Sequence, residues 1–205
     1  MINELISAVL QILIFAALPF VFYLTKMKKT EGFFDYIGLK KSNPDANLSA
    51  IFLSLLIAGP LLLLSMYNSE FFGIMSDPSS MTGKFRQMEF NAESVIILIV
   101  GAVFKTSLAE EILFRGFIAK RLIALTNYKI GNILQAVLFG LIHSALFLFV
   151  TDSFFFLMVI FLFPAIASYI KVYLNEKVAD GSIIPGWIAH AIANLLAYST
   201  IGFMI

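Results

Sequence analysis

Two adjacent carboxylates and an arginine lie inside the apolar segment KTSLAEEILFRGF, residues 105–117. Glu111 and Arg115 are spaced i, i+4, so on a helix they share one face and can form an ion pair. Glu110 points about 100° away from Glu111 on the same helix and has no partner within it. We therefore expect Glu111 and Arg115 to support the structure and Glu110 to be available for chemistry.

Three further polar side chains lie in apolar stretches of the chain. His143 and His190 are the only histidines, and Asn194 follows His190 at the i, i+4 spacing. A carboxylate beside a neutral imidazole can hold and deprotonate a water molecule. A second imidazole and an amide N–H₂ can donate to a developing oxyanion. Together with Glu110, these groups predict hydrolysis of a peptide or ester carbonyl by activated water.

Two other interpretations of the same residues are available. Glu110, His143 and His190 can form a two-histidine, one-carboxylate zinc site, although the chain has no HExxH motif. We favour activation of water without a metal or another cofactor. Polar residues in membrane helices can also simply hold neighbouring helices together. Phe139, one turn before His143, is expected to pack beside it.

Membrane helices must position these residues, because the composition is that of an integral membrane protein. Of the 205 residues, 60% are hydrophobic and 13% are charged, whereas about a quarter of a soluble domain is charged. The mean hydropathy is +0.92. A net charge of +1 argues against a nucleic-acid partner. We predict an all-α, polytopic helical bundle in the lipid bilayer, formed by a single membrane domain, residues 1–205.

Six stretches approach the roughly 20 apolar residues that a membrane-spanning helix needs. The third is too long for one upright span, so it is strongly tilted or continues beyond the membrane. The six are Leu5–Leu24, Leu48–Met66, Ser94–Leu125, Ile130–Val150, Phe154–Leu174 and Ile183–Met204.

The basic residues predict the direction in which the six spans cross the membrane. Only Lys84 and Arg86 fall on one side. Ten fall on the other side, namely Lys26, Lys28, Lys29, Lys40, Lys41, Lys120, Arg121, Lys129, Lys171 and Lys177. This bias places the first loop in the cytoplasm and both termini outside.

The polar groups also agree in depth. At about 1.5 Å per helical residue from the cytoplasmic flank, Glu110 lies roughly 15 Å deep, His143 roughly 21 Å and His190 roughly 11 Å. Asn194 lies about a turn further in. An ionisable group in a span costs about 2.5–3.5 kcal/mol or more without partners or water. We therefore expect one polar, hydrated site in the cytoplasmic half of the membrane.

Three motifs occur in order along the chain: EExxxR from Glu110, FxxxH from Phe139 and HxxxN from His190. This ordered triple, with each motif in an apolar helix, resembles the CAAX protease and bacteriocin-processing family, also called the Abi family. That family includes the Rce1-type prenyl-protein endopeptidases, which are glutamate intramembrane proteases. The resemblance covers residues 94–204, the expected catalytic core.

The resemblance implies a role for each motif position. Glu110 would activate the catalytic water together with His143. His190 and Asn194 would stabilise the oxyanion, and Glu111 with its arginine would hold the site together.

Small bacterial members of the family are tied to peptide processing, bacteriocin self-immunity and regulation of partner membrane proteins. We therefore expect an endopeptidase in the bacterial cytoplasmic membrane that cleaves a membrane-anchored or amphipathic peptide. The alternative is a non-catalytic immunity or scaffold protein that binds a partner membrane protein.

Overall fold

The computed structural model describes all residues 1–205, and its secondary structure is entirely helical. Six helices are long and apolar enough to cross a membrane, namely Ile2–Met27, Pro44–Tyr67, Ala92–Leu125, Tyr128–Phe147, Phe154–Val178 and Ile184–Met204. No end of these helices differs from the predicted span by more than four residues. The prediction of an all-α, multi-pass membrane protein is therefore confirmed.

Several of the six long helices consist of consecutive α-helical and π-helical segments, which are labelled α and η. The first is α1 (Ile2–Met27) and the second is α3 (Pro44–Tyr67). The third helix, residues 92–125, comprises α6 (Ala92–Ile99), η1 (Val100–Leu108), η2 (Glu111–Ala119) and α7 (Lys120–Leu125). Then follow α8 (Tyr128–Phe147), α9 (Phe154–Tyr173) with η3 (Leu174–Val178), and α10 (Ile184–Ser199) with η4 (Thr200–Met204). The loops contain α2 (Phe33–Tyr36), α4 (Ser69–Met75) and α5 (Met81–Arg86).

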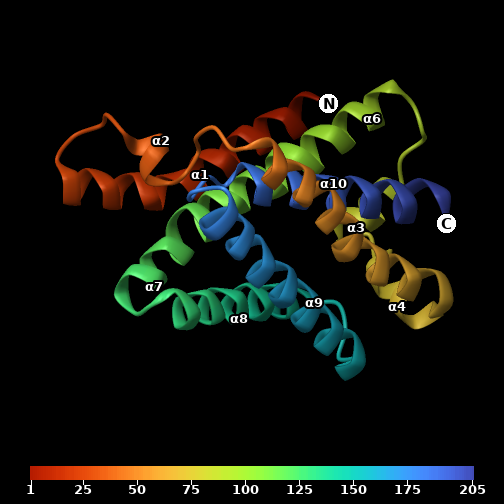
Figure 1. The fold of residues 1–205 in the computed structure, drawn as a ribbon. Helices are drawn as coiled ribbons and strands as arrows, with labels where there is room; N and C mark the ends of the chain where they lie inside the picture. The colour runs from red at the N-terminus through yellow and green to blue at the C-terminus, as the bar shows by residue number, and fades with distance from the viewer.

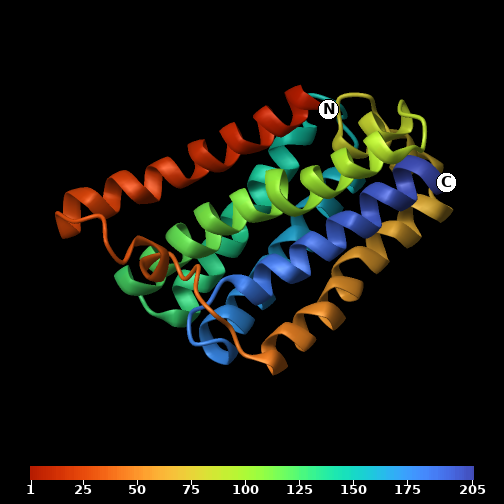
Figure 2. The ribbon, with the colours of Figure 1, turned by 90° about the horizontal axis from the view of Figure 1, so that it is seen from above.

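Four of the long helices form one layer. Figure 2 shows α1, the third helix, α10 and α3 side by side in that order. The pair α8 and α9 lies against one side of this layer (Figure 1), where α8 contacts η2 and α9 contacts α10 and α3. Both termini lie at the same end of the bundle, as expected for an even number of crossings.

Polar side chains just outside the spans determine where several helices begin. Asn43 Oδ1 accepts a hydrogen bond from Ala46 N at 2.8 Å at the start of α3. Asn127 caps α8 in the same way, and Asn91 forms a capping box with Ser94 at the start of the third helix. Each cap satisfies a backbone N–H that has no partner within its helix.

The third helix is π-helical over most of its central part. Segments η1 and η2 flank Ala109 and Glu110, so the motif carboxylates lie at the junction between them. Thr106 Oγ1 and Ser107 Oγ turn back to carbonyls five residues earlier, at 2.9 and 2.6 Å. π-Helical turns are rare and are found mostly at functional sites.

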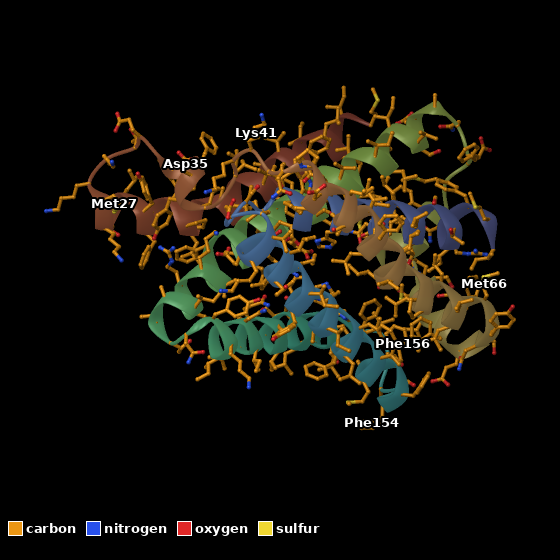
Figure 3. The ribbon with its side chains drawn as sticks, viewed as in Figure 1. Met27, Asp35, Lys41, Met66, Phe154 and Phe156 are labelled. Atoms are coloured by element: carbon orange, nitrogen blue, oxygen red, sulfur yellow. The ribbon has the colours of Figure 1, made fainter.

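The first loop closes over one end of the bundle. Ile183 N donates to Gly38 O at 2.8 Å, and Ser182 Oγ donates to Lys40 O at 2.7 Å. Gly38 has φ +75, and a Cβ there would lie 2.2 Å from Gly181 O. Figure 3 shows Asp35 and Lys41 of this loop at the opposite end of the molecule from the labelled Met66 and Phe154.

The other end carries an ion network that includes Lys105, to which the sequence assigns no role. Glu4 Oε1 lies 2.5 Å from Lys84 Nζ, and Glu4 Oε2 lies 3.6 Å from Lys105 Nζ. Lys105 therefore ties the third helix to α1 at the end of the bundle near the termini, away from the motif carboxylates.

Candidate active site

Glu111 is the centre of a buried ion cluster. Its side chain is 0% exposed. Oε2 lies 3.3 Å from Arg115 Nε, which is the pair that the i, i+4 spacing predicts. Oε1 accepts from Lys171 Nζ at 2.6 Å and lies 3.0 Å from His190 Nδ1. Three helices of the bundle therefore meet at this one carboxylate.

Lys171 is the residue that the sequence interpretation misplaced. It was counted among the basic residues on the cytoplasmic flank, yet it is 2% exposed and its ammonium points into the bundle. Lys171 points inward because an ammonium within an apolar helix is stabilised by a buried carboxylate rather than by the membrane surface. The position of Lys171 inside an apolar run of the sequence is the feature that could have indicated this burial. Without Lys171, nine basic residues still lie on the predicted cytoplasmic side and two on the other side.

His190 connects the two motif carboxylates. Its Nδ1 faces a carboxylate oxygen of Glu111, so Nδ1 carries the proton and donates. Its Nε2 lies 3.9 Å from Glu110 Oε2. That oxygen is buried and has no hydrogen-bond partner. The two neighbouring acids thus differ in environment: Glu111 has three charged or polar partners, whereas the one ion-pair contact of Glu110 is with the second ring nitrogen of the histidine.

Phe139 packs among the charged groups of the site. Its ring centroid lies 3.9 Å from the Arg115 guanidinium carbon, 5.3 Å from Lys171 Nζ, 4.2 Å from the His143 ring and 6.3 Å from the His190 ring. Cations over an aromatic face are attracted by its quadrupole, most strongly where water is excluded. Phe139 therefore contacts both imidazoles and supports both cations.

His143 Nδ1 donates to the carbonyl of Phe139, one turn earlier in α8, at 2.9 Å. This bond fixes the neutral tautomer in which Nε2 keeps its lone pair. The ring is partly exposed. Its unprotonated nitrogen is thus available to accept a hydrogen bond from water.

Three polar contacts fix the position of α10 on η1. Trp187 Nε1 donates to Val103 O at 2.7 Å. Asn194 Nδ2 donates to Thr106 Oγ1 at 3.0 Å and to Ser107 Oγ at 3.2 Å. Both amide hydrogens are used in this structure, whereas the sequence interpretation had one aimed at an oxyanion. The reason is local, because Thr106 and Ser107 both lie on the η1 surface that faces α10.

Two of these residues were not found from the sequence. Trp187, the only tryptophan of the chain, precedes His190 by three residues and lies on the same face of α10. Asn175 Oδ1 accepts from Gly186 N at 2.9 Å. A Cβ on Gly186 would lie 2.9 Å from Glu111 Oε2, so this glycine lets α10 approach the ion cluster.

The structure thus brings Glu110, Glu111 and His190 into one group, and Phe139 joins His143 to it. Asn194 lies apart from this group in its contacts and bonds only to η1. No three His, Asp or Glu side chains lie close enough together to hold a metal ion.

A comparison with protein families matches this part of the chain. The profile of the Rce1-like type II CAAX prenyl endopeptidases covers residues 92–196, just over half of the chain and all three motifs. No curated protein and no solved structure matches the chain. The matched residues include the ion cluster, both histidines and the π-helical segments described above. The chain belongs to the Rce1-like family of type II CAAX prenyl endopeptidases.

Proposed function

We propose that the protein is a glutamate-type, metal-independent intramembrane endopeptidase in which Glu110 activates the attacking water. One observation carries the proposal. Glu110 Oε2 is buried without a hydrogen-bond partner, and its one ion-pair contact, with His190, is 3.9 Å long, while the adjacent Glu111 accepts two hydrogen bonds at Oε1 and pairs with Arg115 at 3.3 Å. A buried carboxylate oxygen needs a hydrogen-bond donor, and water is the donor that hydrolysis also consumes.

The geometry around Glu110 supports a water site. With its proton on Nδ1, neutral His190 presents a lone pair at Nε2, 3.9 Å from the Glu110 oxygen. Two acceptors cannot bond each other, but a water with hydrogen bonds of about 2.8 Å can donate to both. His143 Nε2 is a further acceptor across the Phe139 ring.

The reaction then follows from these groups. Water attacks the scissile carbonyl carbon while its proton passes to Glu110, assisted by His143. The carbonyl oxygen becomes an oxyanion, which needs hydrogen-bond donors. Collapse of this intermediate breaks the C–N bond, and the proton held by Glu110 moves to the leaving amine. Atoms and charge balance without a covalent intermediate.

Two donors are available for the oxyanion. Asn194 can give up its longer bond, 3.2 Å to Ser107, and keep the one to Thr106. His190 can donate from Nε2 only as an imidazolium, because Nδ1–H is already committed to Glu111; the proton for that form is the one that Glu110 takes from the water, which returns to Glu110 before the C–N bond breaks. In that form, the Glu111 carboxylate stabilises the ring in the way an acid supports a catalytic histidine.

The proposed substrate is a membrane-anchored peptide that reaches the site from the cytoplasmic half of the bilayer. The excess of basic residues at the first-loop end supports this orientation, and the family supports a CAAX-like carboxyl-terminal sequence. Peptide processing or bacteriocin self-immunity in a bacterial cytoplasmic membrane is the cellular role we propose.

The test uses the purified full chain in lipid vesicles. The probe is a farnesylated peptide ending in Cys-aliphatic-aliphatic-Xaa, and the membrane peptides of expressing cells are compared by mass spectrometry in parallel. Glu110→Gln should lower the cleavage rate by about 10²- to 10⁴-fold, the usual contribution of a general base. Glu70→Gln, on the exposed face of α4, is the matched control and should cleave normally.

Full cleavage by Glu110→Gln would overturn the assignment. If that variant also preserves a cellular phenotype that deletion abolishes, the protein acts by binding a partner membrane protein instead. Loss of activity on addition of a zinc chelator would contradict the metal-independent mechanism.

A further inference from the structure

Lys171 has no place in the three motifs, yet it makes the shortest contact of the ion cluster, 2.6 Å from its Nζ to Glu111 Oε1. We propose that Lys171 is a positioning residue of the endopeptidase, which balances the charge beside Glu110 without binding it and holds Glu111 in place for His190. This inference rests on the proposed function of Glu110.

A charge count explains why a second cation is needed. Arg115 alone suffices to neutralise Glu111, and it is already paired with Oε2. Glu110, whose side chain is 20% exposed, adds a second negative charge beside this pair. Lys171 supplies the matching positive charge, so the two carboxylates and the two cations sum to zero while both histidines are neutral.

The position of Lys171 is as important as its charge. The ammonium contacts Glu111 rather than Glu110, so Glu110 is stabilised through space at low dielectric while its oxygen stays free of a direct partner. A lysine paired directly with Glu110 would compete with the water for that oxygen. Lys171 therefore balances the charge of Glu110 while leaving the Glu110 oxygen free to accept a hydrogen bond from water.

Lys171 also shares one oxygen with His190. Both Nζ and the ring Nδ1 contact Glu111 Oε1, so the ammonium fixes the atom to which the imidazole is oriented. Phe139 closes the other side of the ammonium at 5.3 Å. Loss of the ammonium leaves Oε1 free to rotate and removes the orientation of His190 Nε2 toward Glu110.

A purely structural role makes a different prediction. If Lys171 only ties α9 to the third helix, its removal lowers the amount of folded protein, while the folded fraction cleaves normally. If it is a positioning residue, folded protein shows a lower kcat with an unchanged KM, because the substrate does not contact the ammonium.

The experiment compares Lys171→Gln, Lys171→Met and Lys171→Arg with the wild type and Glu110→Gln, on the farnesylated peptide. Lys171→Gln can still donate to Glu111 and serves if Lys171→Met fails to fold. We expect kcat to fall about 10- to 100-fold in the neutral variants, as for outer residues that orient a histidine. Lys171→Arg should recover most of this loss. Lys177→Met is the control, because Lys177 is exposed and lies over Tyr128 at 4.4 Å.

Rescue by Lys171→Arg and a change confined to kcat are readouts that a structural tie would not produce. Wild-type kcat in folded Lys171→Gln and Lys171→Met would overturn this inference. If wild type cleaves no faster than Glu110→Gln, the proposed function itself fails, which is a distinguishable result.

Discussion

Replacing Gly186 by alanine is the most direct probe of how tightly α10 packs on the ion cluster. An added Cβ would lie 2.7 Å from Asn175 Nδ2 and 2.9 Å from both Asn175 Oδ1 and Glu111 Oε2. Neither side chain can easily move away. Asn175 is 1% exposed and accepts from the Gly186 N–H, and Glu111 is held by three charged or polar partners.

The magnitude follows from these contacts. Overpacking costs about 1–3 kcal/mol, and loss of the hydrogen bond between Gly186 and Asn175 adds about 1 kcal/mol. The free energy of unfolding should therefore fall by about 2–4 kcal/mol, which for a chain of this size lowers Tm by about 4–16 °C. A decrease in the free energy of unfolding would be informative, because replacing a helix glycine by alanine ordinarily stabilises a protein by about 0.5–1 kcal/mol.

The assay is thermal unfolding of the purified protein in detergent micelles, followed by circular dichroism. Gly73→Ala in α4 is the matched control, because a Cβ there meets nothing within 4 Å and should leave Tm unchanged or raise it slightly. A Gly186→Ala protein that melts with the wild type would refute the close packing of α10 on the Glu111 carboxylate.

Two further predictions concern the neighbours of the proposed catalytic groups. Phe139→Leu removes the ring over the Arg115 guanidinium and should lower the free energy of unfolding by about 2 kcal/mol, as for a desolvated cation–π contact; an unchanged detergent melting curve would show that the ring does not support the cation. Thr106→Val removes the shorter hydrogen bond of Asn194 and should destabilise by about 1–3 kcal/mol. Because the released amide N–H can serve the oxyanion, kcat of the folded Thr106→Val protein should stay within several-fold of wild type, and a loss as large as that of Glu110→Gln would contradict this role of Asn194.

The fold was largely predictable because lipid imposes one simple demand. Each span must be a long apolar helix whose backbone bonds are satisfied internally, and the composition shows six such stretches. The predicted spans differ from the observed helices only at their ends, where a single capping side chain can determine the residue at which a helix begins. Tyr128, two residues before the predicted start of the fourth span, is helical because Asn127 caps the helix there.

The candidate site was predictable only in part. The i, i+4 spacing of Glu111 and Arg115 corresponds to the ion pair, because both residues lie on one helix. The partners of Glu111 on other helices were not predictable. A lysine near the end of an apolar run, such as Lys171, can reach the membrane surface or a buried acid, and periodicity does not distinguish the two.

The amino-acid sequence by itself determined the number of spans, the three motifs and the separation of Glu110 from Glu111 around their helix. Only the tertiary structure decided that Lys171 points inward, that His190 binds Glu111 through Nδ1, and that Asn194 bonds to η1. The physical reason is that spacing along a helix fixes which side chains share a face. Which faces meet depends on the rotation and close approach of neighbouring helices, and these are set by packing at many residues together.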